Sequence, residues 1–327
     1  MSRIEVCGFA NAILDVLVKI DDDLFNALGL EKGTMRLVDE AEQKSLLAAC
    51  SKFPSQKVSG GSVANSIIAC AQLGAKAGLI GRMGDDENGR FYKAECESLG
   101  IKMPNALSPG ETTGTCLSII TPDAERTMRT SLGAAKALGE DNLPLDVIFS
   151  SDWLFIEGYV ISNGLKVREV LRKLLAEAKT KHLKIAFTVS ESWVVNSFRD
   201  IVEDIVSQSD LVFCNASEAC ALTGETSEES AFELLSSKLP GVAVTAGEKG
   251  AFVSWKGVKG FVEAFQREAV DLTGAGDMFA GALIYGILRN VPILEAARKA
   301  CFLAGEVISG VGARLQTDIK VLWEQCS

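Results

Sequence analysis

Histidine is almost absent from this sequence, and the short motifs with which cysteines bind metals are missing. The chain has a single histidine, His182, and its nine cysteines are scattered without any Cys-x-x-Cys pair. Because zinc sites need cysteine and histidine ligands at close spacing, this composition argues against a zinc site. Most of the cysteines stand in apolar runs, where they are typical of small buried side chains in a reducing cytoplasm.

No apolar run is long enough to cross a membrane. The longest, near 278–288, is far shorter than the roughly 20 residues of a spanning helix, and Glu5 and Asp15 interrupt the region where a signal peptide would lie. Positive charge is also scarce, since 33 basic against 43 acidic side chains give a formal net charge of −10. Nucleic acids and anionic membranes attract the opposite balance, so we expect neither as a partner.

Internal repeats, low-complexity tracts and clear linkers are absent too, so we expect a single domain over residues 1–327. Strand-like and helix-like segments alternate through most of the chain, which indicates a mostly parallel sheet between two layers of helices, an α/β/α sandwich. Three segments interrupt this alternation, at about 12–20, 33–38 and 112–133. We interpret them as a small β lid over the carboxyl ends of the main strands, where open α/β sheets bind ligands.

The expected elements follow from apolar periodicity and from turn residues. We predict strands at 4–9, 14–20, 34–38, 77–81, 115–121, 126–132, 153–157, 184–189, 211–214 and 241–245, then a hairpin turning at 256–257. We predict helices at 23–30, 39–51, 62–73, 87–99, 165–181, 196–208, 216–223, 227–238, 275–289 and 293–309.

The segment Asp271–Asp277 (DLTGAGD) places two glycines at the start of a predicted helix. The turn can point its N–H groups inward, and the helix N-terminus adds partial positive charge, so a polyphosphate can bind here. Asp277 can then take a proton from a hydroxyl, which predicts a kinase for a small alcohol. A plain helix start is the alternative, because Gly-x-Gly and an early aspartate are common there. No Walker loop occurs, and Gly276 is followed by Gly281, which does not fit a dinucleotide fingerprint.

A second glycine-rich segment lies much earlier, at 58–66 (VSGGSVANS). Gly60 and Gly61 permit a close backbone approach to a ligand, and Asn65 offers both a donor and an acceptor. The alternative is a strand-to-helix turn in which Ser62 caps the helix.

Together with the glycine-rich stretch 73–89, these two segments strongly resemble the motifs of the ribokinase-like (PfkB) family of carbohydrate and nucleoside kinases. The resemblance runs essentially from end to end. It implies one α/β/α domain with a β lid, ATP as phosphoryl donor, and Mg²⁺. It also implies that Asp277 is the base that deprotonates the acceptor hydroxyl, and that the anion hole consists of Gly274, Ala275 and Gly276.

Asn215 and Glu218 match the family's Asn-x-x-Glu motif, which implies that they organise Mg²⁺ and phosphate, often through water. The alternative is a helix N-cap followed by a capping-box glutamate. The resemblance further implies ATP contacts at Asn215, Thr245, Gly247, Gly274 and Gly276. Leu272 departs from the small residue or threonine that is usual in the family. This weakens the inference of activation by a monovalent cation such as K⁺, which stays open.

Within the family, the layout is most similar to that of adenosine kinases and their bacterial relatives. Asn11 and Asp15 match a segment whose aspartate holds ribose hydroxyls, and a carboxylate suits a vicinal diol. The resemblance implies that Gly61 and Asn65 hold the sugar as well. The residues implied to surround a purine are Leu37, Cys116, Met128, Leu132 and Tyr159. The alternative for Asp15 is a surface position in a lid strand, but Asp15 interrupts an apolar run, which indicates a specific partner. The alternative for Tyr159 is plain core.

Two charged residues depart from the adenosine kinase pattern, namely Glu157 before Gly158 and Arg129 in a lid strand. They either pair with each other or face a polar substrate, so three hypotheses stay open. The first is a cytoplasmic kinase for the 5′-hydroxyl of adenosine or a related nucleoside, which would act in purine salvage. The second is a sugar kinase for ribose, fructose or a keto-deoxy sugar acid, and the third is a non-catalytic nucleotide sensor. Free strand edges on an exposed lid face leave both a monomer and a lid-mediated homodimer open.

Overall fold

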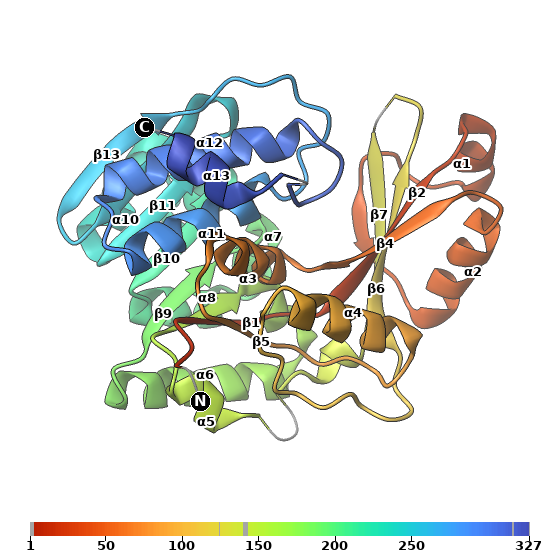
Figure 1. Ribbon diagram of the computed structural model, residues 1–327, viewed down its shortest axis with the longest axis horizontal. Helices are drawn as coiled ribbons and strands as arrows, with labels where there is room; N and C mark the ends of the chain where they lie inside the picture. Colours follow the sequence, from red (N-terminus) through yellow and green to blue (C-terminus); the bar gives the residue numbers. More distant parts are fainter. Residues whose placement is uncertain (1–2, 124, 140–142, 316, 327) are drawn as a thin grey trace.

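The main sheet of the computed structural model is mostly parallel, as predicted (Figure 1). The structure describes residues 3–123, 125–139, 143–315 and 317–326. In spatial order the strands are β5 (Ala77–Ile80), β1 (Val6–Phe9), β8 (Trp153–Glu157), β9 (Lys184–Thr188), β10 (Leu211–Asn215), β11 (Gly241–Thr245), β12 (Gly250–Trp255) and β13 (Val258–Glu263). The first six are parallel, while β12 and β13 form an antiparallel hairpin at one edge.

Helices cover both faces of this sheet, so its central strands are buried throughout and read as continuous apolar runs. Successive residues of β8 show the two layers: Trp153 and Phe155 belong to one hydrophobic cluster, whereas Leu154 and Ile156 belong to the other. The first cluster includes side chains from α3 (Ser62–Leu73), α4 (Glu87–Ser98), α11 (Ala275–Leu288), α12 (Ile293–Ile308) and α13 (Ile319–Gln325). The second contains α5 (Leu145–Phe149), α6 (Leu165–Thr180), α7 (Ser192–Ser197), α8 (Arg199–Gln208), α9 (Ala216–Thr223) and α10 (Glu228–Lys238).

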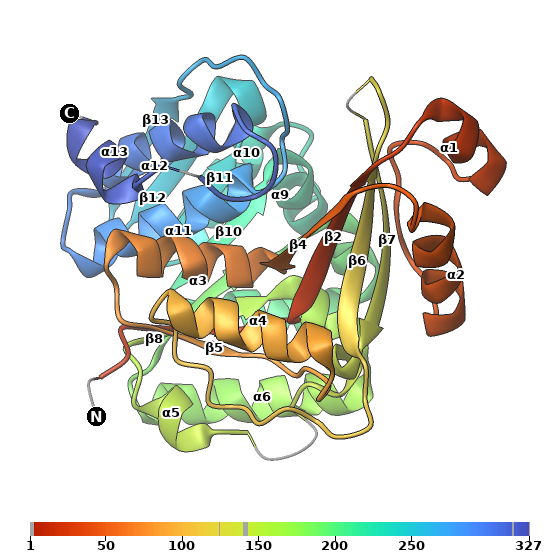
Figure 2. The same cartoon turned by 45° about the vertical axis from the view of Figure 1, so that its right-hand side comes forward.

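A separate five-stranded sheet forms the lid, beside the main body in both views (Figures 1 and 2). Its order is β3 (Met35–Leu37), β7 (Arg126–Gly133), β6 (Thr113–Ile120), β2 (Ile13–Lys19) and β4 (Ser55–Gly60). The sequence did not predict β4. Its first three residues, Ser55, Gln56 and Lys57, are polar and exposed. A strand at the edge of a sheet can form with few apolar side chains, so the apolar pattern that predicts strands is missing here.

The outer face of the lid is covered by α1 (Asp22–Leu28) and α2 (Glu40–Cys50), as Figure 2 shows. Phe25 and Leu46 from these helices pack against Val18 and Leu117 of the lid strands. The expectation of an exposed lid face is therefore wrong, because those strands carry apolar side chains that the helices bury. Among the described residues, the outer edges of β3 and β4 pair with no further strand.

Local signals predicted many element boundaries correctly. The helix over Ser62–Leu73 begins and ends as predicted, as does the helix over Ala216–Thr223. Asp39 caps α2, since its carboxylate accepts from the N–H of Glu42 at 2.8 Å. The short helices α5, α7 and α13 were not predicted. Within the described residues, every helix falls short of the length and apolarity required to cross a membrane.

Candidate functional site

Several polar residues predicted from the sequence lie at one rim of the main sheet, where its parallel strands end. Glu157 ends β8, Asn215 ends β10 and Thr245 ends β11, and Asn215 and Thr245 stand opposite each other in register. Helices α3 and α11 pack against each other and begin near this rim, beside the lid (Figure 1). This brings together the two glycine-rich segments, which lie some two hundred residues apart in the chain.

Asp277, in the first turn of α11, is held by two side chains of α3. Its Oδ1 accepts from the Ser62 hydroxyl at 2.6 Å, and its Oδ2 accepts from the Asn65 amide at 2.9 Å. The interpretation of Ser62 as a helix cap is wrong, because the cap position is Gly61 and no side chain caps α3. Only contact with a residue 215 positions away reveals what Ser62 does, so no local pattern in the sequence could have shown it.

The environment of Asp277 favours a carboxylate that can exchange protons near neutral pH. Burial raises its pKa to about 6, while the hydrogen bonds from Ser62 and Asn65 act in the opposite direction. At neutral pH most of this carboxyl group is therefore ionised and ready to accept a proton.

The turn before Asp277 leaves the N-terminus of α11 open. Gly274 is the cap residue, with a φ of 80° that favours glycine, and no side chain among the described residues caps this helix. A Cβ at position 274 would lie 2.5 Å from atoms of Ala313, so only glycine fits beside that loop. The N–H of Ala275 makes only a long contact of 3.5 Å to the carbonyl of Leu272, and the N–H groups of Gly276 and Asp277 face the open end of the helix. They can bind an anion there, as in other helix N-termini that bind phosphate.

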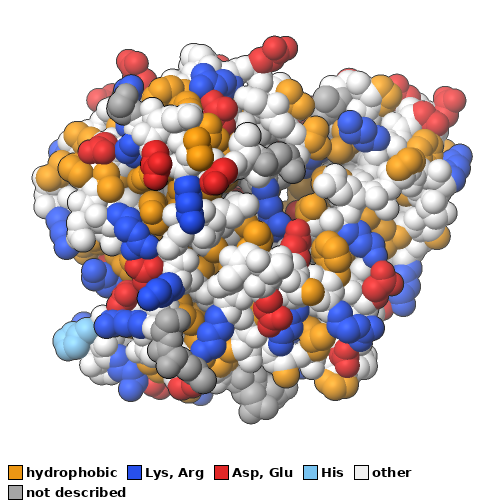
Figure 3. Space-filling view, in the orientation of Figure 1, with side chains coloured by type: hydrophobic (Ala, Val, Ile, Leu, Met, Phe, Trp, Pro, Cys, Tyr) orange, Lys and Arg blue, Asp and Glu red, His pale blue; other side chains and the backbone are white. Residues whose placement is uncertain are grey.

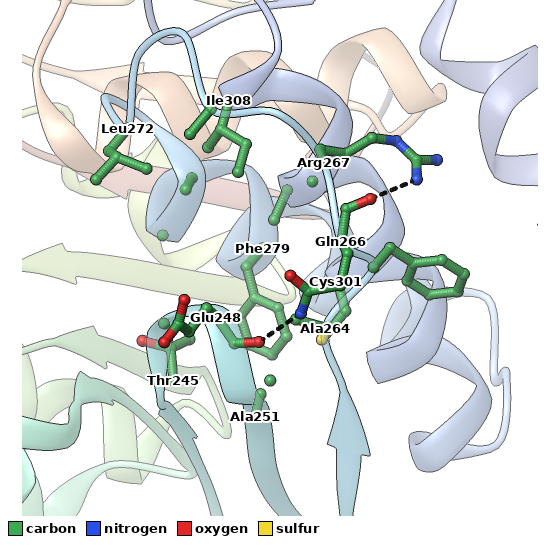
Figure 4. A pocket seen from close by; sticks show the side chains of 18 residues that line it. Thr245, Glu248, Ala251, Ala264, Gln266, Arg267, Leu272, Phe279, Cys301 and Ile308 are labelled. Atoms are coloured by element: carbon green, nitrogen blue, oxygen red, sulfur yellow. Dashed lines mark hydrogen bonds between the residues drawn. The ribbon is translucent and has the colours of Figure 1, made fainter.

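Gly276 and Ser62 line two different pockets near Asp277, and a third pocket, of about 380 Å³, is lined by Asp15, Asn65 and Arg314. The pocket lined by Gly276 is the larger of the first two, with a volume of about 540 Å³, and lies at the end of β11 and the start of β12 (Figure 4). Thr245, Gly247, Ala275 and Gly276 line it, whereas Asn215 and Gly274 do not. Its walls are mostly apolar, and the sequence did not predict them. They include Phe265, Leu272, Phe279, Cys301, Ala304 and Ile308. These residues read as ordinary core, since nothing in their spacing distinguishes a pocket wall from a helix interface.

The smaller pocket, of about 180 Å³, lies between the lid and the main body. The surface is hollowed between these two parts on the face shown in Figure 3. The predicted residues that line the pocket are Asn11, Asp15, Leu37, Gly61, Cys116, Met128, Leu132 and Tyr159. Asn65 does not line it but lines the neighbouring third pocket, together with Asp15. Trp193, which was not predicted, adds a second aromatic wall, with its ring centroid 6.3 Å from that of Tyr159.

Two carboxyl groups in the smaller pocket have raised pKa values. Burial raises the pKa of Asp15 to about 7, against the lowering effect of Arg314 and Arg126, and Asp277 raises it further. Burial also raises the pKa of Glu157 to about 8, although its Oε2 accepts from the N–H of Val63 at 3.1 Å. Near neutral pH, Asp15 is close to half ionised and Glu157 mostly carries its proton.

Arg129 does not line the smaller pocket, in contrast to its neighbours Met128 and Thr130. Side chains alternate across a strand, so Arg129 points to the other face of β7 and is 3% exposed. Its guanidinium donates to the carbonyl of Thr34 at 2.8 Å. The expectation that Arg129 pairs with Glu157 or faces a substrate is therefore wrong.

A different arginine of β7 connects the lid to the segment before Asp277. Arg126 forms an ion pair with Asp271 at 2.5 Å and donates to the hydroxyl of Thr273 at 2.8 Å. Both charged side chains are largely buried, which makes the pair stronger than an exposed one. The lid thereby contacts the DLTGAGD turn directly.

Asn215 and Glu218 form a capping box at the start of α9. The Asn215 Oδ1 accepts from the N–H of Glu218 at 2.9 Å, and the Glu218 carboxyl accepts from the N–H of Asn215 at 3.1 Å. Burial raises the pKa of Glu218 to about 7. Among the described residues no cluster of three or more acidic, histidine or cysteine side chains could hold a metal. The Asn215 Oδ1 and both Glu218 oxygens already accept hydrogen bonds within this box. A carboxylate and an amide oxygen placed in this way suit a Mg²⁺ that keeps its waters, rather than direct ligation.

Solved structures share this fold over the whole chain. The adenosine kinase from Sinorhizobium meliloti matches with a TM-score of 0.89 at 28% identity, covering 100% of both chains. A probable sugar kinase protein from Rhizobium etli CFN 42 also matches with a TM-score of 0.89, at 29% identity over 99% of both chains. The fold and its relatives define a phosphotransferase that acts on an alcohol group.

The sequence comparisons specify the family. The sequence model of the pfkB family of carbohydrate kinases matches residues 35–320. Probable fructokinase-4 from Arabidopsis thaliana is 32% identical over 254 residues, which cover 73% of this chain and 76% of that relative. The chain therefore belongs to the pfkB family, as the sequence predicted. Membership implies ATP as the phosphoryl donor, with Mg²⁺ as its usual companion.

Proposed function

We propose that this kinase transfers the γ-phosphate of ATP to the ribose 5′-hydroxyl of adenosine or of a related nucleoside. The observation that carries the proposal is the position of Asp277 between two pockets. Its neighbour Gly276 lines the larger pocket, while Ser62, which donates to the Asp277 carboxylate, lines the smaller one. A base in this position can act on a hydroxyl in one pocket while the other pocket holds the phosphoryl donor.

In this proposal the larger pocket holds ATP, with Thr245 and Gly247 as contacts and the γ-phosphate at the start of α11. The acceptor oxygen attacks the γ-phosphorus, the bond to the ADP oxygen breaks, and the hydroxyl proton passes to Asp277. The N–H groups of Gly274, Ala275 and Gly276 then stabilise the charge that develops on the phosphoryl oxygens.

The smaller pocket suits a molecule with one polar and one apolar end. At the polar end, Asp15 would accept hydrogen bonds from both hydroxyls of a ribose, supported by Asn11 and Gly61. At the other end, the Tyr159 and Trp193 rings and the apolar lid residues would contact the flat faces of a base. Ser62 and Asn65 would orient the Asp277 carboxylate toward the 5′-hydroxyl.

Asn215 and Glu218 would hold the Mg²⁺ that accompanies ATP, largely through water. The ion would neutralise charge on the phosphate oxygens. Because the Glu218 carboxyl lies in a capping box and has a raised pKa, it must lose its proton to take this role. Involvement of K⁺ is tested separately, by comparing rates in potassium and in choline buffers.

A sugar acceptor is the second candidate, and one observation favours it. Glu157 adds a further polar group to the lining of the smaller pocket, where it contacts the backbone of Asn11. A free sugar has more hydroxyls than a nucleoside and could use both carboxyl groups. The 32% identity to a probable fructokinase points in the same direction.

An acceptor panel separates these two functions. ATP consumption is measured with adenosine, inosine, ribose and fructose at equal concentrations. We expect the highest kcat/KM for adenosine or inosine, because the apolar and aromatic walls contribute binding energy that a free sugar cannot use. A higher kcat/KM for ribose or fructose would refute the nucleoside assignment and support the sugar kinase.

We further propose that the chain acts as one kinase domain over residues 1–327, is cytoplasmic and works as a monomer. Its nine cysteines are all free, which suits a reducing compartment. The two helices cover the outer face of the lid, so a lid-mediated dimer would have only the edge strands β3 and β4 to pair through. Sedimentation equilibrium tests the monomer, and a mass twice that of the chain would contradict it.

A further inference from the structure

The loop between α12 and α13, which faces the lid in Figure 1, contacts the turn before Asp277. The N–H of Gly312 donates to the Asp271 carboxylate at 2.5 Å. The next residue, Ala313, packs against Gly274 so closely that a Cβ there would not fit. Two consecutive residues of this loop therefore support the backbone of the anion hole.

Arg314, which follows Ala313 in the same loop, contacts the lid strand β4. Its guanidinium donates to the Ser59 carbonyl, to the Ser59 hydroxyl at 3.1 Å and to Glu95 Oε1 at 3.1 Å. The other oxygen of Glu95 accepts from the N–H of Ser59 at 2.8 Å and from its hydroxyl. The Arg314 and Glu95 side chains are only 14% and 27% exposed, so solvent weakens this cluster less than a surface pair.

Ser59 directly precedes Gly60, whose backbone contacts the Asp15 carboxylate. A Cβ at Gly60 would overlap the Asp15 carboxylate, so this carboxylate lies flat against the backbone of β4. The carbonyl of Gly60 is fixed in turn by the Tyr92 hydroxyl at 2.9 Å. Strand β4 ends at Gly60, and the next residue, Gly61, is the N-cap of α3. The contacts to Ser59 and Gly60 therefore lie at the junction between the lid and α3.

The charged groups that face Asp15 come from three elements. They are Arg314 from the loop before α13, Arg126 from β7 and Asp277 from α11. Arg314 lowers the pKa of Asp15 more than Arg126 does, against the opposing effects of burial and of Asp277. Cys116 and Tyr92, also close to Asp15, have pKa values raised by burial and stay neutral.

We propose that Arg314 is a positioning residue for the acceptor alcohol. By tying β4 to the loop that supports the anion hole, it holds the hydroxyl bound by Asp15 in register with the phosphoryl group. Its charge also favours the ionised form of Asp15, which accepts from the acceptor's hydroxyls. This inference rests on the proposed function, in which Asp15 binds the acceptor and residues 274–276 bind the phosphoryl group.

The test compares Arg314→Met and Arg314→Lys with a matched control, Arg289→Met. Arg289 forms a similar arginine–glutamate pair with Glu5, at the other end of α11 from Asp277. For each protein we would measure the KM for the acceptor, the KM for ATP, and the pH profile of kcat/KM for the acceptor. Thermal melting of each variant reports on folding.

For Arg314→Met we expect the acceptor KM to rise about tenfold, while the KM for ATP changes less than about twofold. The acid limb of the pH profile should move to higher pH, because Asp15 loses the cation that lowers its pKa most. Arg314→Lys should restore the acid limb, since it keeps the charge, but not the KM, since an ammonium cannot reproduce the forked contacts. Arg289→Met should match the wild type in all three kinetic measurements.

The outcomes are distinguishable. An active wild type whose acceptor KM and acid limb stay unchanged in Arg314→Met overturns this inference alone. A parallel rise of both KM values, with a lower melting temperature, assigns Arg314 to general stability and also overturns it. A wild type that phosphorylates no alcohol of the panel overturns the proposed function, and the inference falls with it.

Discussion

The larger and the smaller pocket beside Asp277 are built in opposite ways. The larger one is made by a single stretch of chain, from Thr245 to Ile308, and its walls are mostly apolar. The smaller one combines lid strands with the main body, from Asn11 to Trp193, and contains two carboxyl groups with raised pKa values. We infer that one contiguous segment forms the proposed ATP pocket. The choice of acceptor, in contrast, depends on how the lid sheet packs against the main sheet.

The largest effect is expected at the residue between the pockets. Asp277→Asn should lower kcat by about 10³-fold, because the amide cannot accept the hydroxyl proton. The KM values for ATP and for the acceptor should change less than about threefold, since the shape of both pockets is kept. Asp204→Asn, on the exposed surface of α8, serves as the control. Near-normal turnover by Asp277→Asn would contradict the role of Asp277 as base.

A change confined to the smaller pocket should separate the two sides of the site. Asp15→Asn should raise the acceptor KM by about 100-fold, because an amide loses the charge-assisted bonds to a diol. The KM for ATP should stay within about twofold, and steady-state kinetics with each substrate varied in turn measures both. If the KM for ATP rose equally, the two pockets would not be the separate donor and acceptor sites proposed.

Trp193 tests whether the far wall of the smaller pocket binds a base. Trp193→Leu should raise the KM for adenosine about fivefold, since a base would lose a stacking surface, and leave that for ribose unchanged. Phe198→Leu is a matched control, because Phe198 packs against the edge of Trp193 but is absent from the described lining of the smaller pocket. Equal effects of Trp193→Leu on both acceptors would favour the sugar kinase.

The smallest effect is a dependence on pH with opposite signs for activity and stability. Asp277 and Asp15, with pKa values of about 6 and 7, must be ionised to act, so activity should rise between about pH 5.5 and 8. Stability should fall over the same range. Because burial holds these pKa values and those of Glu157 and Glu218 above their ordinary 3.8 or 4.5, the folded state binds more protons than the unfolded chain.

Each such group contributes a slope of up to about 1.4 kcal/mol per pH unit to the free energy of unfolding. Thermal melting of the ligand-free protein across this pH range measures the sum. Glu157→Gln mimics the protonated carboxyl and should make the decrease shallower. A melting temperature that rises between about pH 6 and 8 would contradict the assigned pKa shifts.

Local patterns were sufficient for the main sheet, most helices and the chemical class. The turn Asp271–Asp277 and the helix Ser62–Leu73 have short-range signals, namely paired glycines followed by apolar residues at helical spacing. The edge strand β4 had no such signal, because its exposed residues are polar. Arg129 was misjudged for a related reason, since period-two alternation shows that neighbours differ in direction but not which one faces the ligand.

By itself, the sequence determined the order of the elements, the open N-terminus of α11 and the carboxylate in its first turn, since each depends on residues close together in the chain. Only the tertiary structure decided that Ser62 and Asn65 hold Asp277, that Trp193 faces Tyr159, that α1 and α2 cover the lid, and that Arg314 joins the lid to the anion-hole loop. These contacts join residues far apart in the chain. Their geometry is set by the packing of whole layers, which no local periodicity encodes.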